Sequence, residues 1–271
     1  MDNKFLINAK NKNLRACQLK QLSILEEVAK ICEKYKIDYW LDAGTLLGAV
    51  RHNGFIPWDD DIDIGMSIID FKKFTEVAPK ELPPHLFLQT SKSDPSYNRS
   101  TTKVRDLNSL YIEPEEDFNK AYQKGIFIDI FPFINYPDIP KSLLKKLCKG
   151  YWVSYYILHK QHYYSLRSFI ELLYFSFKII TIKIIWNFIC LFSKKDTYMS
   201  YILPDNVYGT TQRIDSIYPL SEISFEGKIF KAPANPDAYL KDLFNDYMKI
   251  PPKEKQRSHA IYINSELIQE I

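Results

Sequence analysis

Acidic side chains occupy every second position from Asp59 to Asp63, where the chain reads Asp-Asp-Asp-Ile-Asp. In an extended chain alternate side chains face the same way, so Asp59, Asp61 and Asp63 are predicted to share one face. Ile62 and Ile64 would then point into a core. Carboxylates held this close repel each other unless a cation neutralises them. Because Mg2+ and Mn2+ take carboxylate, water and phosphate oxygens as ligands, the segment predicts a metal-dependent phosphate site.

Two other structures are compatible with this acidic run. A solvated acidic turn is one, although such a turn does not need the apolar Ile62 and Ile64. A calcium loop is the other, but its sixth position requires Gly for a sharp turn, and the chain has Ile64 there, with Gly65 one residue late. Pro57 also disfavours a helix that enters such a loop.

A second feature precedes the acids and suits an anion. Residues 37–42 are predicted to form a strand, and residues 46–51 a short helix. Between them Ala-Gly-Thr leaves backbone N–H groups at a helix N-terminus unpaired and able to bind phosphate. Gly44 would let a phosphate approach the backbone, and Thr45 would add a hydroxyl and cap the helix.

The end of this short helix carries a basic pair. Arg51 and His52 are expected either to hold phosphate oxygens or to complement the helix dipole, and both readings stay open. Asn53-Gly54 is typical of a tight turn, which would make a hairpin that leads to the acids.

A further acid lies in a different apolar run, Gly-Ile-Phe-Ile-Asp-Ile-Phe-Pro-Phe, as Asp129. The run predicts a buried central strand, in which an ionised carboxylate needs a metal or a cationic partner. We favour the metal or catalytic role over an ion pair with a neighbouring strand. Upstream, Lys103 and Arg105 alternate with apolar residues, so they would share a strand face and grip a diphosphate, unless this is a solvated edge strand.

These segments together resemble the LicD family, whose relatives include the fukutin-type phosphopolyol transferases. The resemblance is carried by three segments of the sequence, Leu41–Met66, Lys103–Asp106 and Phe127–Pro132. It implies a nucleotidyltransferase-like α/β (α+β) fold, with a mixed sheet flanked by helices. It also implies transfer of a phospho-alcohol, typically phosphocholine from CDP-choline, onto a surface glycan such as lipopolysaccharide, teichoic acid or capsule.

The resemblance also assigns roles to the acids. Asp61 and Asp63 match the metal-binding pair, Asp59 flanks them and Asp129 matches the third acid. Mg2+ or Mn2+ bound there would assist in-line attack of a sugar hydroxyl on phosphorus, with CMP leaving. Asp129 or Asp59 would accept the hydroxyl proton.

Other residues would contact the donor. Charge on the leaving phosphate would be met by Lys103, Arg105 and Arg51. Trp58 and Tyr39 lie beside the motifs and are candidate substrate contacts, since aromatic faces bind quaternary ammonium groups. Near the C-terminus, Arg257 and His259 either contact the donor or finish a surface helix.

Composition fits one catalytic domain over residues 1–271, with a helical insertion at residues 141–200. The 271 residues are 46% apolar, and the formal charge of +3 is too small to indicate nucleic acid as a partner. The N-terminus lacks the apolar core of a signal peptide, and apolar residues recur at helical spacing from Leu14 to Cys32. The four cysteines are expected to be free thiols in a reducing cytoplasm.

The insertion differs in charge from the rest of the chain. Residues 141–195 contain nine Lys, one Arg and a single acid, a net charge of +9 that leaves −6 elsewhere. Residues 169–193 are long enough to span a bilayer, but Lys178 and Lys183 near the centre disfavour this. We expect a helix on the inner membrane surface, with Trp186 facing the acyl boundary, where the acceptor is built on a lipid carrier. The alternative is a pair of core helices that wrap the sheet.

Two other functions remain open from the sequence. A glycosyltransferase that holds a nucleotide sugar through a metal explains the acids, but explains the Gly-Thr segment and Asp129 less well. A non-enzymatic, membrane-associated metal-binding module is the other. The sequence does not identify the transferred alcohol, which would be choline, ethanolamine, glycerol or ribitol.

Overall fold

The computed structural model describes residues 4–97, 99–114, 118, 120–160 and 162–267. The helices are α1 Lys4–Tyr35, α2 Ala43–His52, α3 Ile68–Glu81, α4 Lys141–His159, α5 Leu166–Phe192, α6 Ile214–Ile217, α7 Pro236–Phe244 and the 3-10 turn η1 Lys253–Lys255. The strands are β1 Trp40–Leu41, β2 Asp63–Ser67, β3 Leu86–Gln89, β4 Thr102–Asp106, β5 Leu110–Ile112, β6 Phe127–Tyr136, β7 Tyr198–Tyr201, β8 Gln212–Arg213, β9 Ser221–Phe225, β10 Lys228–Ala232 and β11 Tyr262–Asn264.

A mixed sheet forms the centre of the molecule, as predicted. Its strand order is β1-β2-β6-β4-β3, and β7 pairs with the far end of β6 and with β8. Strands β2 and β6 are parallel, while the other neighbours in this sheet are antiparallel. The apolar run around Asp129 becomes β6, and its inner position agrees with the expectation of a buried central strand.

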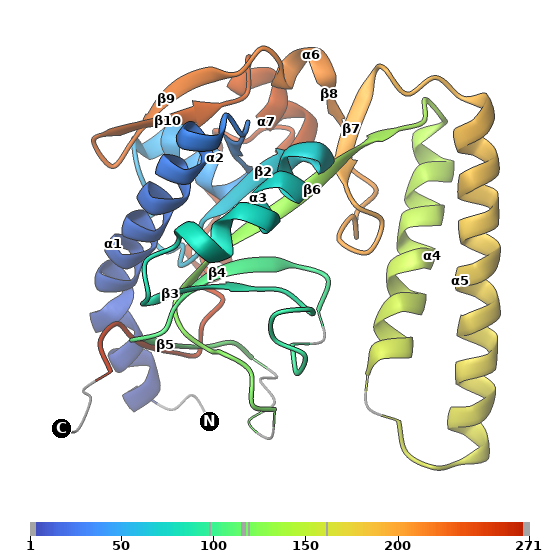
Figure 1. The fold of residues 1–271 in the computed structure, drawn as a ribbon, viewed down its shortest axis with the longest axis horizontal. Coiled ribbons are helices and arrows are strands. Elements are labelled where there is room, and N and C mark those ends of the chain that lie inside the picture. Colours follow the sequence, from blue (N-terminus) through green and yellow to red (C-terminus); the bar gives the residue numbers. More distant parts are fainter. Residues whose placement is uncertain (1–3, 98, 115–117, 119, 161, 268–271) are drawn as a thin grey trace.

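Helices cover the sheet, as Figure 1 shows for α1 and α3. The predicted N-terminal helix is present as α1, and its apolar stripe packs into the main core through Leu25, Val28 and Cys32, among others. The four cysteines are free thiols.

The insertion forms a helical hairpin, made of α4 and α5, that stands beside the sheet (Figure 1). The two helices pack on each other around a small separate core that includes Leu147, Tyr151 and Ile182. The alternative in which they wrap the sheet is therefore wrong. Trp186 was expected to face lipid, but it is buried and its ring lies 5.0 Å from that of Tyr136.

The segment between α2 and β2 also differs from expectation. Asn53 is not in a hairpin turn but caps the C-terminus of α2 with φ 55°. Irregular chain follows, and the strand begins only at Asp63, so Asp59 and Asp61 lie in a loop. Ile62 and Ile64 are nonetheless fully buried, because the chain is already aligned with the core before ladder pairing begins.

Candidate active site

Strand register places two acids and a lysine in one row across the sheet. Asp63 of β2 lies opposite Asp129 of β6, and Lys103 of β4 lies opposite Asp129 from the other side. Side chains at paired positions of neighbouring strands project from the same face of a sheet. The structure therefore brings together Asp63, Asp129 and Lys103, which are distant in the sequence.

Lys103 and Asp129 form the buried ion pair that the sequence left as an alternative to metal binding. The Lys103 Nζ lies 3.0 Å from each carboxylate oxygen, but only the contact to Oδ2 has hydrogen-bond geometry. Asp129 Oδ1 is buried without a hydrogen bond in the described structure, and thus retains an unused lone pair. Every residue of β4 is buried, so the alternative prediction, that Lys103 lies on a solvated edge strand, is wrong.

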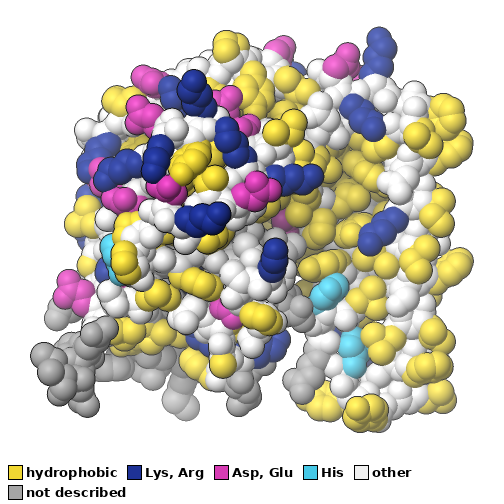
Figure 2. All heavy atoms as spheres, in the orientation of Figure 1, with side chains coloured by type: hydrophobic (Ala, Val, Ile, Leu, Met, Phe, Trp, Pro, Cys, Tyr) yellow, Lys and Arg dark blue, Asp and Glu magenta, His cyan; other side chains and the backbone are white. Residues whose placement is uncertain are grey.

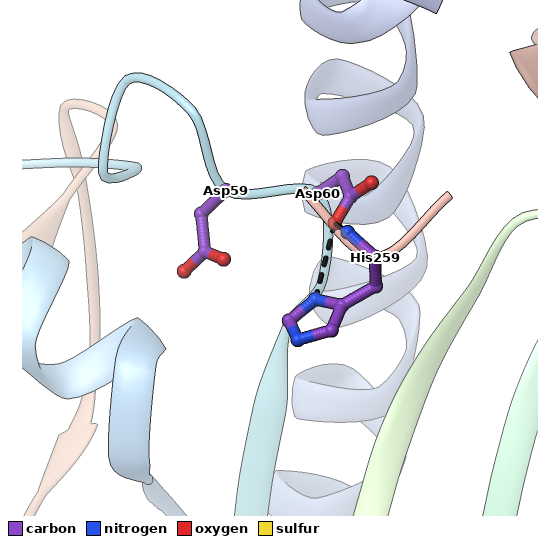
Figure 3. A group of neighbouring side chains, drawn as sticks. All are labelled: Asp59, Asp60 and His259. Atoms are coloured by element: carbon purple, nitrogen blue, oxygen red, sulfur yellow. Dashed lines mark hydrogen bonds and ion pairs between the residues drawn. The ribbon is translucent and has the colours of Figure 1, made fainter. Parts of the chain in front are cut away.

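The acidic loop is held to the C-terminal segment through Asp60. This carboxylate is fully buried and accepts hydrogen bonds of 2.8 Å from the backbone N–H groups of His259 and Ala260. The His259 Nδ1 lies 3.2 Å from Asp60 Oδ1 and 3.3 Å from Asp61 Oδ2. Figure 3 shows this imidazole hydrogen-bonded to Asp60, with Asp59 on the same loop.

Burial and mutual repulsion shift the titration of these acids. Burial raises the pKa of Asp63 well above its ordinary value, and the fields of Asp61 and Asp129 raise it further. Burial, followed by the field of Asp61, raises the pKa of Asp59 to about 8. The hydrogen bond to Asp60 raises the pKa of His259 to about 9. The site thus holds more negative charge than Lys103 and His259 neutralise.

One group in this site has the spacing of a metal site. One ligand atom from each of Asp59, Asp60 and His259 lies within 4.8 Å of the others. Asp60 is the least available of the three, because burial raises its pKa but the hydrogen bonds from His259 and Ala260 outweigh burial and lower it overall. Its oxygens already accept three N–H groups, so it serves mainly to fasten the loop.

Helix α2 begins directly beside these acids. Its N-cap is Asp42 rather than Thr45, which we had expected to cap it: Asp42 accepts from the Ala43 N–H at 2.7 Å. The Thr45 hydroxyl instead accepts from the backbone N–H of Asp63 at 2.8 Å, which fixes the start of β2. A Cβ on Gly44 would lie 3.0 Å from Asp59 Oδ2, so this glycine leaves space where Asp59 meets the helix.

The basic pair at the end of α2 lies near the acidic loop. Arg51 donates to the Tyr247 carbonyl at 2.9 Å and to the His52 ring at 2.9 Å. Burial lowers the pKa of Arg51, and the field of Asp59 opposes that shift. Trp58 is half-buried, and its ring centroid lies 6.4 Å from that of His52, with the two rings nearly perpendicular. These three residues are placed to contact a ligand on the Asp59 side.

Two predicted substrate contacts lie elsewhere. Arg105 is only 2% exposed and donates to Gln89 at 2.5 Å and to the Gly125 carbonyl at 2.6 Å, so it braces β4 rather than gripping a phosphate. Tyr39 is buried near Cys32 and Glu222, on the side of β9 and β10, away from the acids. Tyr39 precedes β1 and lines a groove with Ile229 and Phe230 of β10.

Several supporting residues were not predicted from the sequence. Gln21 of α1 donates to the carbonyls of Asp60 at 2.7 Å and Phe127 at 3.1 Å, which ties the acidic loop to β6. Asp42 is fully buried and accepts from the hydroxyls of Tyr201 at 2.8 Å and Tyr239 at 2.5 Å. The one local signal for Gln21 is a polar residue on the buried face of an amphipathic helix.

Comparison with known proteins agrees with this geometry. A family model described as "LicD/FKTN/FKRP, nucleotidyltransferase domain" matches residues 36–168. The chain is 31% identical to the lipopolysaccharide cholinephosphotransferase LicD of Haemophilus influenzae, over 93% of this chain and 97% of that protein. It is 43% identical to the human ribitol 5-phosphate transferase FKRP over 53 residues, which are 18% of this chain and 11% of FKRP. Mouse FKTN, a ribitol-5-phosphate transferase, is 27% identical over 42% of this chain and 21% of FKTN.

Proposed function

The chain belongs to the LicD family and is a phosphotransferase, and from this premise we propose that it transfers phosphocholine from CDP-choline to a hydroxyl of a cell-surface glycan, releasing CMP. The observation that carries the proposal is the row of Asp63, Asp129 and Lys103, which lies beside Asp59 and Asp61 in a chain that matches a cholinephosphotransferase along almost its whole length. Lipopolysaccharide is the first acceptor to test, because that relative carries it in its name.

The carboxylates fit a hard divalent cation, for which we propose Mg2+ or Mn2+. Asp61, Asp63 and Asp129 would supply oxygen ligands, and the buried Asp129 Oδ1 accepts no hydrogen bond from a described residue, although Lys103 is ion-paired with it. The raised pKa values of Asp63 and Asp61 indicate negative charge that the protein alone leaves poorly compensated. When bound, such an ion would supply Lewis acidity toward the phosphate oxygens.

The residues of the site support an in-line displacement. The acceptor oxygen forms a bond to the phosphorus that carries choline, while the bond from that phosphorus to the CMP oxygen breaks. Asp59 lies on the same loop and would accept the hydroxyl proton in its ionised form, whose fraction grows as pH rises toward its raised pKa of about 8. Lys103 and Arg51 are placed to offset charge on the phosphate oxygens.

Donor turnover tests this proposal. Purified enzyme is incubated with CDP-choline, CDP-ethanolamine, CDP-glycerol or CDP-ribitol, with Mg2+, Mn2+ or EDTA, and with a lipid-glycan extract, and CMP release is measured. We expect metal-dependent release with CDP-choline, reduced about 100-fold or more in Asp61→Asn and Asp129→Asn. Asp38→Asn is the matched control, because Asp38 is exposed and lines a different groove, beside β10.

The same experiment identifies the contrary result. Release of UDP or GDP from a nucleotide sugar, with no CMP from any CDP-alcohol, would replace the proposal by a glycosyltransferase. CMP release from CDP-ribitol alone would keep the reaction type and change the transferred alcohol.

We also propose that the enzyme works at the inner face of the cytoplasmic membrane. By length and composition α5 is the one described helix that passes as a candidate span, and only 17% of its most apolar window is buried. Many of its exposed side chains are apolar, among them Leu173, Phe177 and Ile184, while Arg167 and Lys183 are exposed as well. With the +9 charge of residues 141–195, these apolar side chains suit a helix that lies in an anionic lipid surface.

A further inference from the structure

A cavity separates the hairpin from the sheet and reaches the catalytic row. Its volume is about 710 Å3, and Lys103 and Asp129 contribute to its wall on the sheet side. Helix α4 supplies the opposite wall, and Figure 2 shows the surface hollowed between the hairpin and the rest of the molecule. A ligand in this cavity therefore lies between the hairpin and the proposed site of phosphoryl transfer.

Helix α4 presents an aromatic face to the cavity. Trp152, Tyr155, Tyr156 and His159 line it and recur at the spacing of one helix face. The rings of Trp152 and Tyr156 are stacked, with centroids 5.7 Å apart and planes at 19°. Neither ring contributes to the packing of the main core or of the hairpin core, and Tyr156 is 53% exposed. These two side chains are therefore free to contact a ligand.

The acids in the cavity wall differ in how their charge is compensated. Asp129 is paired with Lys103, and Glu113 with Arg99 at 3.0 Å. Asp205 accepts a hydrogen bond from the Ser100 hydroxyl, but no described cation forms an ion pair with it. Its Oδ2 is buried without a hydrogen bond from any described group. Burial raises the pKa of Asp205 to about 6, so the side chain is still mainly ionised at neutral pH.

We propose that this cavity binds the cationic head of the donor, a quaternary ammonium group, with Trp152 and Tyr156 as its aromatic wall and Asp205 as its counter-charge. A quaternary ammonium has no N–H group to donate, so it is recognised by aromatic faces and by unpaired negative charge. The proposal rests on the proposed function, because it takes the phosphate of the same donor to lie at the row of Asp63, Asp129 and Lys103.

Donor kinetics and direct binding test this assignment together. The variants are Trp152→Leu, Tyr156→Leu and Asp205→Asn, with Tyr164→Leu as the control for loss of an exposed tyrosine outside the cavity. We expect the KM for CDP-choline to rise about tenfold in the three cavity variants, with kcat changed less than about twofold. Tetramethylammonium chloride should compete with CDP-choline in the wild type, and calorimetric titration should show its binding weakened in the same variants.

The outcomes separate this inference from the proposed function. If CDP-choline is the donor and its KM is unchanged in all three cavity variants, the cavity assignment is wrong and the transferase stands. If no CDP-alcohol is used but tetramethylammonium binds and Trp152→Leu abolishes binding, the proposed function fails and the cation site stands. A rise in KM for the glycan acceptor alone would make the cavity an acceptor site and overturn the inference.

Discussion

Single residues carry the chemistry of this site in two different ways. Asp63 and Asp129 owe their proximity to strand register, which the alternating apolar pattern around each acid helps to specify. Asp60 and His259 owe theirs to a contact across 199 positions of the chain. The first pair act as candidate ligands, whereas the second pair fasten the loop that carries Asp59 and Asp61.

The Asp60–His259 contact makes a testable contribution to stability. The His259 pKa is about 9 in the folded protein, above its ordinary value of 6.5. A group whose pKa is raised on folding stabilises fully below its unfolded pKa, and this contribution is lost as pH rises through the folded value. His259→Asn should therefore lower the free energy of unfolding at pH 6 and have little effect at pH 9.5.

Denaturant unfolding in EDTA at both pH values measures this difference. The variant is compared with the wild type at each pH, which removes the titration of groups that do not interact with His259; Asp59 and Asp61 do interact with it. The backbone N–H of residue 259 still donates to Asp60 in the variant, so only the imidazole is tested. An equal destabilisation at pH 6 and pH 9.5 would show that the imidazole acts by packing and not by charge.

At the scale of elements, helix α2 contains two glycines with different surroundings. A Cβ at Gly44 would lie 3.0 Å from the Asp59 carboxylate, whereas a Cβ at Gly48 would lie 2.5 Å from the Gly54 carbonyl oxygen. The first contact is with a side chain that can turn, and the second is with backbone that cannot. Gly44→Ala should leave the free energy of unfolding within about 0.5 kcal/mol and impair CMP release, because it displaces Asp59.

Gly48→Ala is the matched comparison within the same helix. We expect it to destabilise the protein by about 1 to 3 kcal/mol, because the backbone after α2 must shift to admit the methyl group. Thermal unfolding and CMP release measured on both variants separate the two effects. Destabilisation by Gly44→Ala as large as that by Gly48→Ala would show that this helix terminus is structural and has no particular role in placing Asp59.

The elements also show which parts of the site the sequence can specify. Strand β6 and helix α1 were predictable because their apolar patterns are local and repeat along the chain. The position of Arg105 was not, because alternation places it on the face of Lys103 but does not reveal that Gln89 and Gly125 take its donors. The partners of Asp60 and Gln21 likewise come from distant segments, and no local pattern encodes such pairings.

The whole molecule combines a sheet that carries the acidic site with a helical hairpin that is basic and has an apolar outer face. The outer stripe of α5 includes Phe177 at 73% and Ile184 at 63% exposed, and Figure 2 shows apolar side chains along this side of the molecule. Its charged residues lie off this stripe, where Lys178 and Lys183 approach aromatic rings of the hairpin itself. A helix of this kind is suited to lie in a lipid interface, with its cations directed to the head groups.

Vesicle sedimentation tests this arrangement. Wild-type protein should bind vesicles that contain about one-third phosphatidylglycerol and bind pure phosphatidylcholine vesicles weakly, because the basic hairpin is attracted to anionic lipid. The double variant Phe177→Ser, Ile184→Ser should lower vesicle binding about tenfold or more, since it removes two apolar side chains from the interface. Ile69→Ser is the control, because Ile69 is 77% exposed but lies on α3, away from the hairpin. Equal binding of the double variant and the control would contradict a lipid contact. If the wild type is a dimer and the double variant is a monomer, the stripe would instead be an interface with a second copy of the chain.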